Sequence, residues 1–314
     1  MSFVLAGRLA AVVGGVLVVA LSACASPGGV GDGGGPSSPD HDYEAVAQWA
    51  AEVADAWSPA GDAWRTGYVP LQEPTGVDGE LTEVEKRAAA AGWWETAVTL
   101  PADKPAAGKV LFRDGELTAP LLSAAEAYRL MDLGDPPPCS SVGPSVSVAP
   151  SGDGSVSAPA GGDCVGLTVS GASLATMEMR TSRGVATVPA WRFEISGGRG
   201  VLRAAVEAVA ASPAPAATPN RAAPAEMVAA QGVTGVDGLE LRYQLGVGAC
   251  DRDITPVVVE RPHVVVVAGG VRRDSGECTD QLLIEPVSWT LAEPLGDRPV
   301  LDGLNGTLLP LGGL

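Results

Sequence analysis

The stretch SLATMEMRTSRGVATVPAWRFEIS, residues 173–196, decides the fold class. Its two halves are rich in β-branched residues or alternate between apolar and polar side chains, and Gly184 lies between them. This pattern is typical of two strands joined by a short turn. Similar segments recur to the end of the chain, in LTVSG (167–171), GRGVLRAAV (198–206), LELRYQLG (239–246), TPVVVERPHVVVVAGG (255–270), QLLIEPVSWTL (281–291) and RPVLDGLNGTLLPL (298–311). No helix pattern long enough for a crossover separates them, so the sequence predicts mainly antiparallel pairing in a sandwich or partly closed barrel.

The region before these strands mixes helix and strand patterns. Apolar residues at spacings of three and four predict a helix over 42–57 that starts near an Asp cap. The other predicted elements are a helix over 82–94, with a capping box of Thr82 and Glu85 and a closing Gly92, a hairpin over 109–117, and a helix over 123–134 that ends at Gly134. The expected fold class is therefore α+β, with a small mixed helical and strand lobe followed by a mainly antiparallel, β-sandwich-like lobe.

A low-complexity span marks the expected boundary between the two lobes. Residues 136–163 are rich in Pro, Gly and Ser and have no periodic apolar face, which predicts a loop. The mixed lobe is therefore expected over 40–135 and the β-rich lobe over 164–314.

The first residues have the pattern of an export signal. Arg8 is the only charge before LAAVVGGVLVVALSA (9–23), and small residues end this apolar run. A membrane-spanning helix is the alternative, but about 15 apolar residues containing Gly14 and Gly15 are too few for one. We expect a signal peptide over 1–23.

The signal ends in Leu21-Ser22-Ala23-Cys24, which resembles the bacterial lipobox. The resemblance implies that the Cys24 sulfur receives a diacylglycerol and that acyl chains anchor the mature chain to a membrane. A cysteine that closes an ordinary secretory signal is the alternative. The Gly-, Ser- and Pro-rich segment 24–39 is expected to be a flexible tether. The expected location is the outer face of the cytoplasmic membrane, exposed to the cell wall or the extracellular space.

Composition limits the classes of partner that the chain can bind and the covalent bonds that its cysteines can form. A formal net charge of -17 argues against nucleic-acid binding, which needs a basic face. Four cysteines remain besides Cys24, and in an exported chain an even number indicates disulfides. Three connectivities are possible for Cys139, Cys164, Cys250 and Cys278. We predict Cys139–Cys164 and Cys250–Cys278, because each closes a local loop. No C-x-x-C is present, so we expect no metal site and no cofactor.

A few side chains are candidates for ligand contact. Five of the seven tryptophans precede residue 95, and tryptophan surfaces suit sugar rings. Most of them lie on faces already predicted to be apolar, so core packing is the preferred interpretation, and Trp64 and Trp94 are the two candidates for ligand contact. Asp297 and Arg298 are expected in a tight turn, where stabilising the turn is preferred over ligand contact.

Catalytic patterns are weak. The chain has no G-x-S-x-G motif, and His263 is the single candidate for a Ser-His-Asp site. A strand histidine with an ordinary hydrogen bond is the preferred interpretation of His263. Two of the many carboxylates could serve a glycosidase, but the sequence does not rank the pairs. We therefore expect a non-enzymatic binding or structural module of the cell envelope, whose partner is a cell-wall polymer or an envelope protein. An envelope glycan hydrolase that uses a carboxylate pair is the alternative.

Three phrases carry a resemblance to a set of uncharacterised lipoproteins of high-GC actinobacteria. They are AWRTGYVPLQ (63–72), TSRGVATVPAWRFEI (181–195) and EPLGDRPVLDGLNG (293–306). The resemblance implies an exported, lipid-anchored location and the use of disulfides. It implies no activity for any residue.

Overall fold

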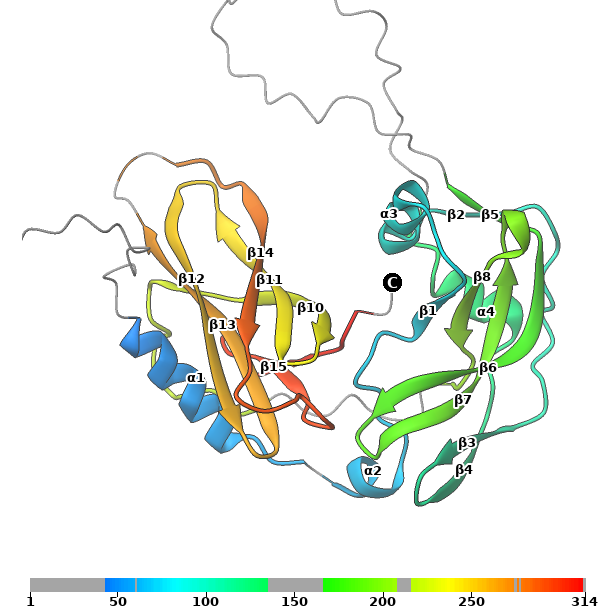
Figure 1. Cartoon of the computed structure of the whole chain (residues 1–314), viewed down its shortest axis with the longest axis horizontal. Helices are drawn as coiled ribbons and strands as arrows, with labels where there is room; N and C mark the ends of the chain where they lie inside the picture. The colour runs from blue at the N-terminus through cyan, green and yellow to red at the C-terminus, as the bar shows by residue number, and fades with distance from the viewer. Residues whose placement is uncertain are drawn as a thin grey trace, which may run out of the picture. The chain divides into compact units, whose positions relative to one another are not determined.

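The computed structural model describes residues 43–59, 61–134, 166–207, 216–273, 276 and 278–312. Strands dominate this part of the chain, most of them pair antiparallel, and the helices are few, as Figure 1 shows. The expected α+β class is confirmed. The signal peptide, the tether, the span 136–163 and the three cysteines Cys24, Cys139 and Cys164 lie outside the described residues.

The α-helices among the described residues are short and lie in the first half of the chain. They are α1 (Glu44–Ala56), α2 (Gly61–Thr66), α3 (Glu83–Ala91) and α4 (Ala124–Arg129). None of these helices is long and apolar enough to cross a membrane.

The first sheet is built around the stretch that opened the sequence analysis. It consists of β1 (Thr75–Asp78), β3 (Gly108–Phe112), β4 (Gly115–Ala119), β6 (Gly171–Thr181), β7 (Gly184–Glu194) and β8 (Gly200–Ala204). β6 and β7 are two of the predicted strands, and they pair antiparallel along their whole length. Gly184 has φ +86, a conformation that suits glycine in a tight turn. β3 and β8 both pair with β7 on the edge that β6 leaves open, so β7 is the centre of the sheet.

The predicted helix ends are confirmed in α3, whereas α4 and α1 each differ from the prediction at one end. In α3, the Thr82 and Glu85 capping box is present and Gly92 ends the helix with φ +69. α4 has a capping box of its own, but it stops at Arg129 instead of running to Gly134 as predicted. α1 also differs from the prediction, because its N-cap is Tyr43 and no side chain caps it.

The second half of the chain forms a sandwich. One sheet has the order β10 (Ala230–Asp237), β11 (Glu240–Gly248) and β14 (Leu282–Thr290). The other contains β9 (Met227–Val228), β12 (Asp251–Arg261), β13 (Val264–Arg273), β15 (Val300–Asp302) and β16 (Leu308–Leu309). β13 and β15 pair in parallel, an exception to the antiparallel rule, as is the short pair β2 (Trp94–Thr96) and β5 (Leu167–Val169).

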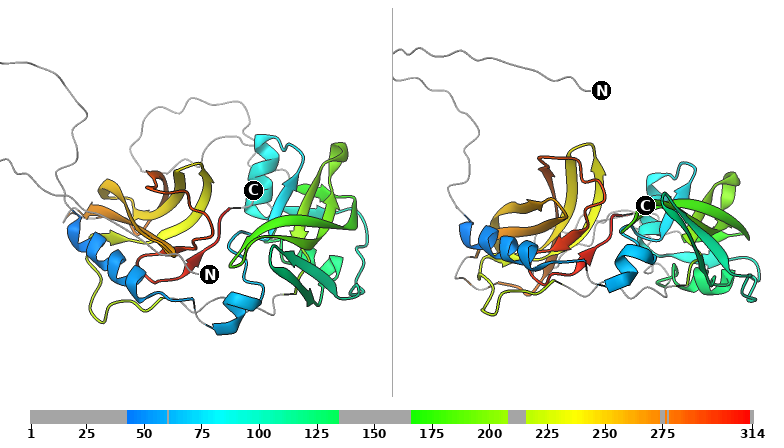
Figure 2. Two further views of the ribbon diagram at one scale, coloured as in Figure 1. Left: turned by 60° about the horizontal axis from the view of Figure 1, so that its bottom comes forward. Right: turned by 90° about the horizontal axis from the view of Figure 1, so that it is seen from below.

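Strand β13 is buried on both faces, which explains its unbroken run of valines. On one face Val265 and Val267 pack with the buried side chains of β11. On the other face Val264 and Val266 pack against the apolar stripe of α1. Figures 1 and 2 both show α1 lying along β12 and β13. The result is a three-layer arrangement of one helix and two sheets.

The hydrophobic cores do not divide where the sequence predicts a boundary. The first core draws on residues 68–131 and again on 167–206, so its sheet takes strands from both sides of the span 136–163. The segment 44–57, expected in the mixed lobe, packs instead with residues 216–308. Pro- and Gly-rich composition identifies a loop, but only strand pairing shows whether that loop leaves a domain or returns to it.

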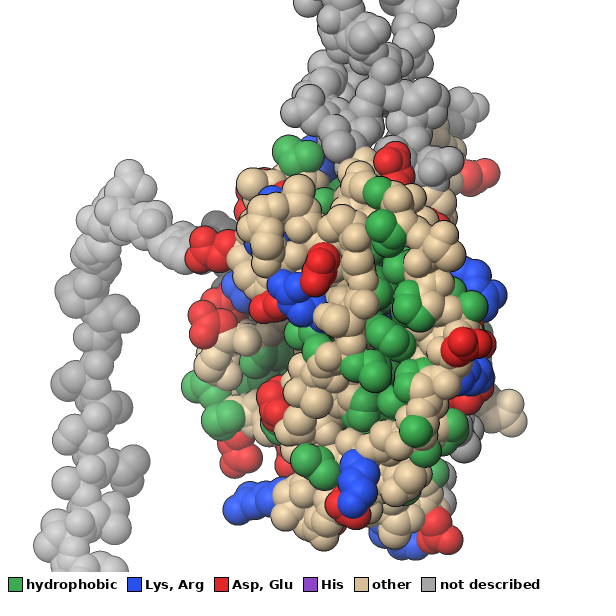
Figure 3. Space-filling model, turned by 90° about the vertical axis from the view of Figure 1, so that its right-hand side faces the viewer, with side chains coloured by type: hydrophobic (Ala, Val, Ile, Leu, Met, Phe, Trp, Pro, Cys, Tyr) green, Lys and Arg blue, Asp and Glu red, His purple; other side chains and the backbone are tan. Residues whose placement is uncertain are grey.

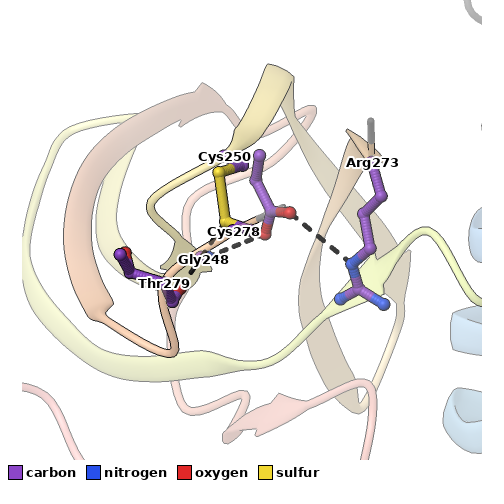
Figure 4. The surroundings of a disulfide bond; sticks show 6 residues. Gly248, Cys250, Arg273, Cys278 and Thr279 are labelled. Carbon is purple, nitrogen blue, oxygen red and sulfur yellow. Dashed lines mark hydrogen bonds and ion pairs between the residues drawn. A yellow bond between two sulfur atoms is a disulfide. The ribbon is translucent and has the colours of Figure 1, made fainter. Parts of the chain in front are cut away.

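The disulfide between Cys250 and Cys278 is present, which confirms one of the two predicted pairs. It joins the turn after β11 to the residues before β14, beside a carboxylate network (Figure 4). Asp251 accepts a hydrogen bond from the Gly248 N–H at 2.7 Å and lies 3.6 Å from the Arg273 guanidinium. The disulfide therefore fixes the start of an edge strand that otherwise pairs only with β11 among the described strands.

Several apolar side chains on the first sheet are exposed. They include Leu111, Leu174 and Val185, on β3, β6 and β7. Figure 3 views the side on which Figure 1 draws these strands and shows a band of hydrophobic side chains there. Large exposed apolar areas often mark interaction surfaces.

Candidate functional site

Three of the four candidate contact residues meet at one surface pocket. Trp64, Asp297 and Arg298 line it, and it measures about 260 Å³. His263, the single histidine candidate, lines the same pocket. The remaining wall is made of Trp57, Pro59, Pro262 and Pro299. We call it the aromatic pocket.

Four separate elements supply these side chains. Trp57 follows α1 directly and its backbone N–H donates to Val53, so the helix positions it. Trp64 lies on α2. His263 lies in the turn between β12 and β13, not within a strand as predicted. The turn before β15 carries Asp297 and Arg298.

The rings form a compact cluster centred on Trp57. The Trp57 and His263 rings are stacked, with centroids 5.7 Å apart and planes 17° apart. Trp64 meets Trp57 edge to face at 5.4 Å. Trp57 is buried, Trp64 is half-buried and His263 is exposed. The cluster therefore has a buried base and two rings that a ligand can reach.

Arg298 serves the fold of this turn. Its guanidinium lies 3.0 Å from the Glu260 carboxylate, and it also donates to the carbonyls of Glu293, Pro294 and Leu295. Its side chain is only 10% exposed. These contacts agree with the predicted turn-stabilising role, and they use most of the hydrogen-bond donors of the Arg298 guanidinium.

Asp297 is the exposed carboxylate of the aromatic pocket. Its charge also acts on Arg180, a half-buried residue of β6 that donates to the carbonyls of Gly296 and Arg298. Burial lowers the pKa of Arg180, and the nearby Asp297 opposes that change. Arg180 therefore holds the Asp297 turn against the β6–β7 hairpin.

Trp94 lies elsewhere. It is buried in the first core, on β2, and it lines a second and larger pocket of about 640 Å³. The sequence analysis named Trp94 as a candidate for ligand contact, but its side chain is only 3% exposed. A three-residue strand gives no alternation from which this burial could be predicted. This second pocket, which we call the polar pocket, also contains Glu73, Thr75 and Arg203.

Neither pocket presents the carboxylate pair that a glycosidase uses. Of the residues that the structure describes, Asp297 is the one carboxylate lining the aromatic pocket, and Glu73 is the one lining the polar pocket. Asp302 is fully buried, and burial raises its pKa, but it accepts backbone hydrogen bonds from Ala230 and Asn305 and so has a structural role. Among the described residues, no cluster of three or more His, Cys, Asp or Glu could hold a metal ion.

Comparisons with known protein families, with curated proteins and with solved structures found no match to this chain.

Proposed function

We propose that this protein is a lipid-anchored binding module of the cell envelope that contacts sugar rings of a cell-wall polymer through the aromatic pocket. The observation that carries the proposal is the meeting of Trp57, Trp64 and His263 in one ring cluster, with the exposed Asp297 beside it. Three segments far apart in the sequence build this site: residues 57–64, the β12–β13 turn and the turn before β15.

The chemistry of the pocket suits a saccharide. The C–H face of a sugar ring packs on aromatic faces, and its hydroxyls donate to a carboxylate. The exposed rings and Asp297 supply both kinds of contact at one place. Its single carboxylate favours binding over hydrolysis, because a glycosidase uses two carboxyl groups about 5–10 Å apart.

The anchor is supported by the N-terminal sequence. The lipobox-like segment ending at Cys24 and the Gly-rich tether 24–39 would hold the described part of the chain near a membrane surface. A binding module tethered in this way samples the cell wall at high effective concentration.

The test is cosedimentation of the purified full chain with isolated cell-wall polymer. Trp64→Ala should weaken binding at least about tenfold, because stacking on an exposed ring is lost, and Trp64→Phe should keep part of it. Trp289→Ala is the matched control, because Trp289 is an exposed tryptophan of β14 and does not line the pocket.

Two results would overturn the proposal. One is unchanged sedimentation of the Trp64→Ala protein. The other is release of soluble sugar fragments by the wild-type chain that Asp297→Asn abolishes, which would favour the hydrolase alternative.

A further inference from the structure

The polar pocket holds an arginine whose contacts within the chain are few. Arg203 lies on β8 and is the register partner of Thr75 on β1. Its guanidinium donates to the Thr75 hydroxyl at 2.6 Å, and this is the one hydrogen bond that the structure gives it. No carboxylate oxygen of the described residues lies within 4.0 Å of it, although Glu73 lines the same pocket.

Other shielded arginines of the chain have stronger partners. Arg298 pairs with Glu260, Arg199 pairs with Glu85, and Arg180 donates to two carbonyls. Burial lowers the pKa of Arg203, with only a Coulombic contribution from Glu73 and Tyr68 acting against it. Removing a cation from water is costly unless an anion or several acceptors replace the water. The remaining donors of Arg203 are open to the pocket, where water or an acceptor from outside the chain can meet them.

The walls of the polar pocket differ in character. One wall is apolar, with Ala89, Trp94, Met131 and Leu133, and Leu133 is 76% exposed. Gln231 and Gln244, which carry side-chain amides, also line the pocket. A volume of about 640 Å³ lies in the range of small-molecule sites.

We propose that the polar pocket binds a small organic carboxylate with an amide and an apolar group, such as an N-acylated amino acid or the C-terminal residue of a peptide. Arg203 donates to the carboxylate as a fork, Gln231 and Gln244 face the amide, and the apolar group packs beside Trp94 and Leu133. Glu73 makes a dianion such as phosphate the poorer ligand, because its negative charge lies in the same pocket.

The test is an NMR titration of the ¹⁵N-labelled full chain with N-acetyl-L-leucine. The indole signal of Trp94 and the side-chain Nε–H signal of Arg203 should shift and saturate. N-acetyl-L-leucinamide, which lacks the charge, and inorganic phosphate should each bind at least about tenfold more weakly.

Variants separate a binding role from a structural one. Arg203→Met should weaken binding at least about tenfold, and Arg203→Lys should give an intermediate loss, since the charge remains while the fork is lost. Arg113→Met, in the exposed β3–β4 turn, makes the same change in net charge and should bind as the wild type does. Melting temperatures identify any variant that fails to fold. If Arg203→Met does not fold, the affinity of the Arg203→Lys chain for N-acetyl-L-leucine tests the proposal.

The proposal is overturned if N-acetyl-L-leucine gives no saturable shift up to its solubility limit. Equal binding by the Arg203→Lys and wild-type chains, or tighter binding of phosphate than of the carboxylate, would overturn it as well. The aromatic pocket is independent of this site, so Trp64→Ala should leave the titration unchanged and the two proposals fail separately.

Discussion

Removing the disulfide between Cys250 and Cys278 should destabilise one sheet of the sandwich and leave the first sheet unaffected. The bond closes a loop with a sequence separation of 28, and such a cross-link contributes about 3.5 kcal/mol in the chain-entropy model. It lies at the end of the β11–β14 ladder where Gly248 pairs with Leu282. β14 lies at the edge of its sheet and most of its side chains are exposed, so little side-chain packing holds it in place besides the disulfide.

The assay is native-state hydrogen exchange on the Cys250→Ala, Cys278→Ala double variant. A loss of about 3.5 kcal/mol corresponds to roughly 400-fold faster exchange for the ladder amides of β11 and β14 that open with the sheet. The ladder amides between β6 and β7, which belong to the first core, serve as the internal control. Less than about fivefold acceleration in β11 and β14, or equal acceleration in both ladders, would refute the reasoning.

Three further predictions concern the anchor, the turn and the helix cap. Cys24→Ala should release the chain from the membrane fraction into the medium, which fractionation and immunoblotting would measure, and continued membrane association would exclude the lipid anchor. Arg298→Met should lower the free energy of unfolding by about 2–3 kcal/mol, because it leaves the shielded Glu260 carboxylate without its cation, and a double-mutant cycle with Glu260→Gln should show coupling of about 1 kcal/mol or more. The hydrogen bond that the Thr82 backbone N–H donates to the Glu85 carboxylate is the main cause that lowers the pKa of Glu85 from the ordinary 4.5. The ionised Glu85 therefore stabilises the folded chain above pH 4.5, and this stabilisation is lost as pH falls through the pKa of the folded state. Thermal melts across this acid range should show a shallower decline for Glu85→Gln than for the wild type, and parallel curves would contradict the assignment.

The predictions that the structure confirms are those that depend on neighbours in the chain. The Thr82 and Glu85 capping box, the closing Gly92 and the hairpin over 109–117 each involve groups within a few residues, whose geometry the local backbone sets. The same reasoning explains the apolar stripe of α1, which is buried as its period requires.

The candidate site shows where local reasoning stops. Trp64 and Arg298 have no sequence relation, and they meet because α2 and the turn before β15 converge on the β12–β13 turn. Trp94, the other tryptophan predicted as a candidate for ligand contact, is buried in another core. The sequence did not predict a binding role for Arg203, because an arginine in a strand of alternating residues is typical of a solvent-facing position.

The amino-acid sequence was sufficient for the class of the fold, the ends of α3 and the Cys250–Cys278 pair. The partner of each strand, the division of the cores and the composition of both pockets required the tertiary structure. The reason is physical: helix caps and tight turns are set by hydrogen bonds between near neighbours. A strand offers similar edges to many partners, and burial of its side chains against distant residues selects among them.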